Sequence, residues 1–300
     1  MNLGVNIAGV ELKNPIMTAS GTFGSGKDFA PYVDLNRIGC VVVKGVASTP
    51  WPGNRPPRIA EAYGGIINAV GLQNPGVDAF CQDDIPFLRG FDTRIAVNIA
   101  GRTIDEYVEV AERLATADVD LLELNISCPN VKEGGVAFGV DPAMAEAVTR
   151  AVKAVAGQPL IVKLSPNVTD IAAIARAAER GGADAVSLIN TLLGARIDVR
   201  RRAFVLSTKQ GGLSGPAVKP VAVRMVYEVA RAVDLPVIGM GGIMTGEDAA
   251  EFLMAGANAV AVGTANLLNP TATMDILDGL VAFMEETGVD DVNDLVGVVE

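Results

Sequence analysis

The sequence contains no histidine, only three cysteines and few aromatic residues. The absence of imidazole excludes the Ser-His-Asp triad, the HExxH zinc site and every histidine base. A proton acceptor in this chain must therefore be a cysteine, a lysine or a carboxylate.

The cysteines, Cys40, Cys81 and Cys128, are odd in number and widely spaced. This spacing is typical neither of a disulfide framework nor of a CxxC metal site. We therefore expect no metal site in this chain, and any iron–sulfur cluster would have to lie on another polypeptide.

The apolar runs are interrupted by glycine or charge before they reach membrane-spanning length, and residues 1–6 carry no basic segment of a signal peptide. We expect a cytoplasmic protein with no membrane anchor. The formal net charge of −11 also argues against nucleic-acid binding, because neutralising phosphates requires clustered Lys and Arg.

Short apolar runs rich in Val, Ile and Leu recur along the chain and alternate with helical stretches. Near-continuous apolarity, instead of period-two alternation, is typical of strands buried on both faces of a parallel sheet. The runs are residues 15–19, 40–46, 94–99, 120–126, 159–164, 185–190, 236–240 and 258–263. The expected helices are near 75–88, 103–116, 141–155, 168–180, 216–233, 246–255 and 271–287, with a shorter one near 27–36.

About eight strand-then-helix units predict a closed (β/α)₈ TIM barrel with extended βα loops, preceded by a short hairpin at residues 5–12. The alternative is a doubly wound open sheet. Such a sheet would require a glycine fingerprint after its first strand, whereas the glycine-rich turns here follow the last two strands. The barrel is therefore favoured.

These two turns contain Gly241-Gly242 and Gly263-Thr264. Paired small residues let backbone N–H groups approach a phosphate, and barrel enzymes commonly bind phosphate after strands seven and eight. The alternative is that both are only tight strand-to-helix turns. We favour a phosphate site.

Two lysines, Lys44 and Lys163, end apolar strand runs. A lysine in such a run is costly unless its ammonium finds a partner, so both are expected to face an anionic or electron-rich ligand at the barrel mouth. Either amine could instead form a Schiff base. A flavin-free lyase or isomerase acting on a phosphorylated substrate therefore stays an alternative, as does a small-molecule binding subunit without activity.

Asparagines also cluster at predicted strand ends and the adjoining loops, and their amides suit the alternating N–H and C=O edge of a pyrimidine or flavin ring. They are Asn68, Asn98, Asn125, Asn130 and Asn190. Cys128 lies between two of them, in a loop that follows the fourth strand, where a thiolate can remove a proton.

Several segments together resemble the dihydroorotate dehydrogenase family. They are residues 125–130 (Asn-Ile-Ser-Cys-Pro-Asn), 44–45, 68–72, 97–99, 190–191, 212–215, 241–242 and 263–264. Residues 68–74 and 130–135 resemble class 1B, the NAD-linked bacterial type. The resemblance implies a flavoprotein that oxidises (S)-dihydroorotate to orotate in pyrimidine (UMP) biosynthesis, with residues 1–300 forming a single FMN-binding barrel domain.

The resemblance also implies the site residues. The FMN phosphate would lie on Gly241, Gly242, Gly263 and Thr264, and its ring and ribityl chain would meet Ser20, Lys44, Gly45, Asn98, Asn125, Lys163, Ile189 and Gly215. The substrate would meet Lys44, Asn68, Ala69, Val70, Gly71, Leu72, Asn125, Asn130, Asn190 and Thr191. Cys128 would take the C5 proton, with Lys44 as the second catalytic residue.

Class 1B members pass their electrons to a second subunit that carries FAD and a [2Fe–2S] cluster and reduces NAD⁺. The resemblance implies such a partner, in a heterotetramer of two catalytic and two electron-transfer chains around a homodimer core. Fumarate as the acceptor, as in class 1A, stays an alternative.

Overall fold

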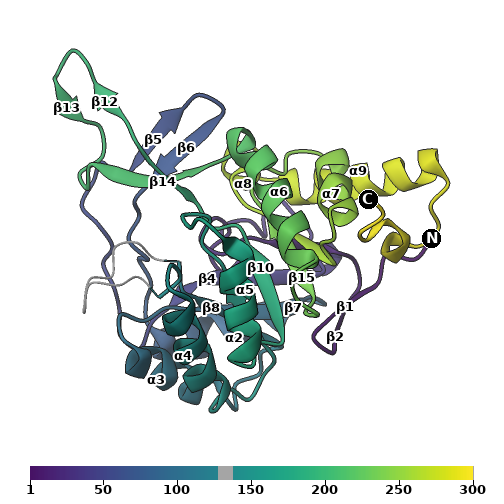
Figure 1. The fold of residues 1–300 in the computed structure, drawn as a ribbon, viewed down its shortest axis with the longest axis horizontal. Coiled ribbons are helices and arrows are strands. Elements are labelled where there is room, and N and C mark those ends of the chain that lie inside the picture. The colour runs from purple at the N-terminus through teal and green to yellow at the C-terminus, as the bar shows by residue number, and fades with distance from the viewer. Residues whose placement is uncertain (128–137, 300) are drawn as a thin grey trace.

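The computed structural model describes residues 1–127 and 138–299, and within them eight parallel strands close a barrel (Figure 1). The strands are β3 (Ile16–Thr18), β4 (Cys40–Val46), β7 (Arg94–Ile99), β8 (Leu121–Asn125), β9 (Leu160–Lys163), β10 (Ala185–Leu188), β15 (Val237–Met240) and β16 (Ala259–Val262). Every predicted apolar run contains one of them, and β16 pairs with β3 to close the sheet. The predicted (β/α)₈ barrel is confirmed.

The helices that follow the strands cover the outside of the barrel (Figure 1). They include α1 (Val77–Ala79), α2 (Ile85–Leu88), α3 (Ile104–Leu114), α4 (Pro142–Lys153), α5 (Ile171–Arg180), α6 (Lys219–Ala230), α7 (Gly246–Met254), α8 (Ala265–Leu268) and α9 (Ala272–Thr287). A π-helical turn, Phe80–Asp84, joins α1 to α2. In α5 the buried residues Ile171, Ile174 and Ala178 recur at helical spacing, so one apolar stripe faces the sheet.

The prediction of a short helix near residues 27–36 is wrong. The chain there forms isolated turns followed by a 3₁₀ turn, Leu35–Arg37. Gly24 and Gly26 just before it have φ of +59° and +82°, which is left-handed backbone that a right-handed helix does not continue.

The extended βα loops form a second, antiparallel sheet. The sequence predicts the extended loops but none of the strands in them. Its order is β11 (Leu192–Ala195), β14 (Gln210–Ser214), β6 (Gly65–Asn68) and β5 (Ile59–Ala62). A hairpin of β12 (Ile197–Asp198) and β13 (Ala203–Phe204) projects from it, away from the barrel (Figure 1). Ala60 of β5 and Ile67 of β6 form a small apolar cluster of their own with Ala69 and Leu206.

The predicted opening hairpin is confirmed as β1 (Val5–Ile7) paired antiparallel with β2 (Val10–Leu12). The two chain ends lie side by side, because Asn2 bridges to Asp291 beside the 3₁₀ turn Val292–Leu295 (Figure 1). A further 3₁₀ turn, Pro216–Val218, precedes α6. None of the helices in the described residues is both long and apolar enough to cross a membrane.

Helices α7 and α9 pack at the closest distance that glycine allows. A Cβ added to Gly246 would lie 2.1 Å from the Gly279 carbonyl carbon and 2.1 Å from the Leu280 backbone nitrogen. A Cβ on Gly279 would meet nothing closer than the Gly246 backbone nitrogen at 3.1 Å. Gly246 therefore sets the spacing of the two helices.

We expect Gly246→Ala to force the two helix backbones apart and to lower the free energy of unfolding by about 1–3 kcal/mol. Gly279→Ala is the matched control, since the better helix propensity of alanine offsets its tighter contact and keeps the change within about 1 kcal/mol. Chemical denaturation of both variants measures this difference. Equal stability of the two variants would show that the close approach does not constrain the packing.

Candidate active site

The carboxyl ends of the barrel strands bring most of the predicted site residues to one mouth. From β3 to β16 in chain order, the strands and the residues that follow them contribute Ser20, Lys44 and Gly45, Asn98, Asn125, Lys163, Ile189 and Asn190, Gly241 and Gly242, and Gly263 and Thr264. Cys128 and Asn130 lie outside the described residues, so their predicted roles stay predictions.

The glycine turns form a cradle suited to a phosphate group. Gly215, Gly241 and Gly242 have φ of +108°, +122° and +89°, a conformation that favours glycine. A Cβ on Gly242 would lie 2.9 Å from the carbonyl oxygen of Gly215, so the two turns touch. The neighbouring Thr264 hydroxyl donates to Ser214 Oγ at 2.9 Å. Side chains are thus excluded where an anion would meet the backbone.

Lys163 is only 4% exposed, and its ammonium donates to Ser20 Oγ at 3.1 Å. That bond uses one of the three ammonium hydrogens. Since a buried ammonium is costly unless its donors are matched, Lys163 is suited to hold an electron-rich ligand at the mouth. The structure therefore places the Lys163 ammonium beside Ser20 and away from the solvent, and its role towards a ligand stays a prediction.

Lys44 is half-buried in β4. Burial, together with the nearby positive charge of Arg58, lowers the pKa of Lys44 below the ordinary lysine range. The Arg58 guanidinium donates to Gln73 Oε1 at 2.6 Å and to the Asn54 carbonyl oxygen at 3.4 Å, which ties this second cation to the loop after β6. The region therefore brings two basic side chains, Lys44 and Arg58, close together beside the barrel mouth.

Three amides at the mouth form a chain of hydrogen bonds. Asn190 Nδ2 donates to Asn125 Oδ1 at 3.4 Å, and Asn125 Nδ2 donates to Asn98 Oδ1 at 3.4 Å. Asn98 Nδ2 then donates to Glu123 Oε2 at 2.6 Å. Glu123 Oε1 also accepts from Ser187 Oγ at 2.8 Å.

The second sheet brings the remaining predicted residues over the mouth. Asn68 Nδ2 donates to the Gly212 carbonyl oxygen at 3.3 Å, and Thr191 packs so closely on Gly212 that a Cβ there would lie 1.9 Å from its Oγ1. The loop with Ala69, Val70, Gly71 and Leu72 follows β6, and Leu72 reaches within 3.4 Å of a Cβ placed on Gly45.

The two cysteines that the structure describes are poor bases. Burial raises the pKa of the Cys40 thiol far above its ordinary value, and the charges of Asp120 and Glu123 raise it further. Burial also raises the pKa of Cys81, which lies in the π-helical turn. Cys40 is buried and Cys81 is partly buried, so we interpret both as packing residues.

Sequence reasoning missed Glu123 and Arg58. Glu123 carries the same signal that identified the two lysines, namely a charged residue inside an apolar strand run, Leu121–Asn125. Arg58 has no comparable local signal, since it precedes a short, partly exposed strand.

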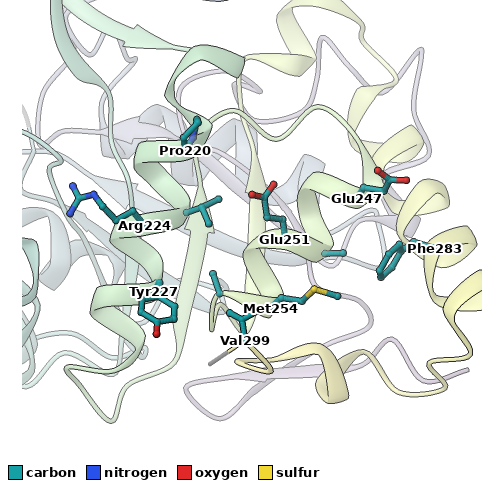
Figure 2. A pocket seen from close by; sticks show the side chains of 11 residues that line it. Pro220, Arg224, Tyr227, Glu247, Glu251, Met254, Phe283 and Val299 are labelled. Carbon is teal, nitrogen blue, oxygen red and sulfur yellow. The ribbon is translucent and has the colours of Figure 1, made fainter.

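A groove of about 610 Å³ lies elsewhere, on the outer helical layer, and Figure 2 shows its lining. Tyr227 and Arg224 of α6 face Met254 and Glu251 of α7, with Phe283 of α9 beyond. None of its lining residues is a predicted site residue. In residues 1–127 and 138–299 no group of three or more His, Cys, Asp or Glu side chains is arranged to hold a metal ion.

A family model and two relatives of high sequence identity all point to the same family. The family model described as dihydroorotate dehydrogenase matches residues 2–284. The chain is 66% identical over 297 residues to the dihydroorotate dehydrogenase B (NAD(+)) catalytic subunit of Alkaliphilus metalliredigens, covering 99% of this chain and 98% of that one. It is 62% identical over 300 residues to the protein of the same name from Lachnoclostridium phytofermentans, covering 100% of both.

A solved structure, that of DHODH in complex with ferulenol from Eimeria tenella, superposes with a TM-score of 0.82. At 24% identity, and covering 99% of this chain and 88% of that one, it is similar in fold.

The lowered pKa of Lys44 can be tested by amine labelling across a pH series, read residue by residue with mass spectrometry. We expect Lys44 to become reactive at lower pH than an exposed lysine of the same chain, because its neutral amine forms earlier. Arg58→Gln removes the neighbouring charge, so the Lys44 profile should move towards higher pH. A Lys44 profile that coincides with that of exposed lysines, or that Arg58→Gln leaves in place, would contradict this electrostatic assignment.

Proposed function

This chain belongs to the dihydroorotate dehydrogenase family, and we propose that it oxidises (S)-dihydroorotate to orotate at the barrel mouth as the catalytic subunit of an NAD⁺-linked enzyme. The activity is a step of pyrimidine (UMP) biosynthesis. One observation carries the proposal most directly: a phosphate cradle, a buried lysine and a row of amides lie around a single mouth. A flavin-free lyase or isomerase has no such support from the family.

The mouth fits a flavin mononucleotide. The turn of Gly241 and Gly242, which both have positive φ, and the turn of Gly263 and Thr264 leave room for a phosphate. The ring and ribityl chain would meet Ser20, Lys44, Gly45, Asn98, Asn125, Lys163, Ile189 and Gly215, where buried donors and amides converge. When bound, FMN accepts the hydride from C6 of dihydroorotate.

The substrate lies between this mouth and the second sheet. Lys44, near the strand end of β4, would meet the anionic carboxylate of dihydroorotate, and the amides of Asn68, Asn125 and Asn190 would match the N–H and C=O groups of its ring. The remaining contacts come from Ala69, Val70, Gly71, Leu72, Asn130 and Thr191. The sheet covers the substrate and keeps water from the reacting carbon atoms.

Cys128 is the catalytic base, and Lys44 is the second catalytic residue. As a thiolate, Cys128 removes the proton from C5 of dihydroorotate, and the C5–C6 bond becomes a double bond. The chain offers no histidine for this step, and the raised thiol pKa values of Cys40 and Cys81 make both unsuitable.

The electrons leave through a partner subunit. The relatives are named catalytic subunits of an NAD(+) enzyme, which supports NAD⁺ over fumarate as the final acceptor. The partner carries FAD and a [2Fe–2S] cluster, and two catalytic chains form a homodimer core in a heterotetramer of two catalytic and two electron-transfer chains. Residues 1–300 act as one FMN-binding domain, in the cytoplasm.

The function is tested with the purified chain. We expect it to be yellow or to take up FMN in one-to-one ratio, and dihydroorotate added without oxygen should bleach the flavin absorbance. Addition of the same buffer without dihydroorotate is the control for photoreduction of the flavin. Protein that takes up no FMN, or whose flavin stays oxidised with dihydroorotate, would contradict the proposal.

The role of Cys128 is tested by Cys128→Ala. Since loss of a general base removes a factor on the order of 10² or more, we expect flavin reduction to slow by that factor while FMN stays bound. Cys81→Ala is the matched control and should reduce at the unmodified rate. Stopped-flow absorbance measures both, and an unchanged rate in Cys128→Ala would remove this residue from the mechanism.

A further inference from the structure

The carboxyl group of Glu123 lies inside the barrel and has no part in the chemistry described so far. It is 2% exposed, and its neighbours in β8, Leu122 and Leu124, are fully buried. Burying a carboxylate costs several kcal/mol in desolvation, as an order of magnitude, unless hydrogen bonds repay it. A group this costly needs a reason beyond filling space.

The contacts of Glu123 cross the interior of the barrel. One oxygen accepts from Asn98 on the adjacent strand β7 at 2.6 Å, and the other accepts from Ser187 at 2.8 Å. Ser187 is on β10, two strands away in the barrel order. Both carboxylate oxygens are therefore matched by donors within the layer just below the mouth.

The bond to Asn98 decides which way its amide points. The Nδ2 group can only donate, so the short bond to Glu123 fixes it towards the barrel interior and turns Oδ1 the other way. Asn98 Oδ1 consequently faces the mouth, where a Cβ on Gly45 would lie 3.0 Å from it and Asn125 Nδ2 meets it at 3.4 Å.

The orientation of the Asn98 amide in turn sets the orientation of the Asn125 amide. Because Asn125 Nδ2 faces Asn98, its Oδ1 faces the Asn190 amide at 3.4 Å and the Ser127 backbone N–H at 3.3 Å. These amide contacts are close to the upper limit for hydrogen bonds and are weak, whereas the 2.6 Å bond to a carboxylate is of the strong, charge-assisted kind. The Glu123 carboxylate thus contributes most of the free energy that favours this orientation of the amides.

We propose that Glu123 is a positioning residue: it sets the donor and acceptor direction of the Asn98 and Asn125 amides, and so the pattern that the mouth presents to flavin and orotate. The inference rests on the proposed function, because it takes the ligands from it. Removing the acceptor at position 123 frees both amides to turn, and the mouth then presents a mixture of donor and acceptor patterns.

The test compares two replacements of similar size in the FMN-loaded chain, with the orotate Kd read from the flavin absorbance change. Glu123→Met removes the acceptor, and we expect the Kd to rise by about tenfold, the equivalent of one directed hydrogen bond. Glu123→Gln keeps an oxygen for Asn98, while its NH₂ group can donate to the Ser187 hydroxyl. Its Kd should stay within about threefold of the wild type.

Ser187→Ala is the matched control, because it removes a hydrogen bond from the same carboxylate without freeing Asn98. We expect it to lower the melting temperature while the orotate Kd stays within about threefold. If Glu123→Met and Glu123→Gln bind orotate equally well, or if Ser187→Ala weakens binding as much as Glu123→Met, the carboxylate is a structural group and the inference is overturned.

A second comparison applies if Glu123→Met does not fold. In Glu123→Gln combined with Ser187→Ala, the glutamine NH₂ loses its acceptor, so nothing holds it away from Asn98. We expect the Kd of this double variant to exceed the product of the single effects by about threefold or more, and a simple product would overturn the inference. Wild-type protein that binds neither FMN nor orotate would instead contradict the proposed function.

Discussion

Closure of the parallel sheet between β16 and β3 is the constraint on which the rest of the molecule depends. A closed parallel barrel leaves no edge strand and collects all strand carboxyl ends at one mouth. Side chains that are far apart in the sequence, such as Ser20 and Lys163, therefore meet at 3.1 Å. The same closure makes the interior dry, so each polar group in it needs a partner inside the barrel.

The polar interior of the barrel and the second sheet each contribute hydrogen-bonding residues to the site. Below the mouth, one oxygen of Glu123 accepts from the amide of Asn98, and the other accepts from the Ser187 hydroxyl. Above it, the sheet of β5, β6, β11 and β14 brings Asn68 next to Thr191 through Gly212. A flat ligand held between these two layers would meet fixed hydrogen-bonding groups on its edges, while the glycine turns take its phosphate.

The barrel strands are predictable from sequence because they are buried on both faces. Burial on both faces requires a nearly continuous apolar run, such as Cys40–Val46. The second sheet is not, because its strands are short and mixed in burial, and β6 pairs with β14 across a long sequence separation. Lys44, Lys163 and the glycine turns carry a local signal. Arg58 acts through space and carries none, and the role of Cys128 stays a prediction from family resemblance.

The most direct test of the whole account is a crystal structure of the chain with FMN and orotate bound. The account predicts the phosphate on the turns of Gly241 and Gly263, the ring beside Lys163, and orotate between the flavin and Asn68, with Asn98 Nδ2 still directed at Glu123. A flavin bound anywhere else, including the groove between α6 and α7, or an Asn98 amide turned away from Glu123, would contradict it.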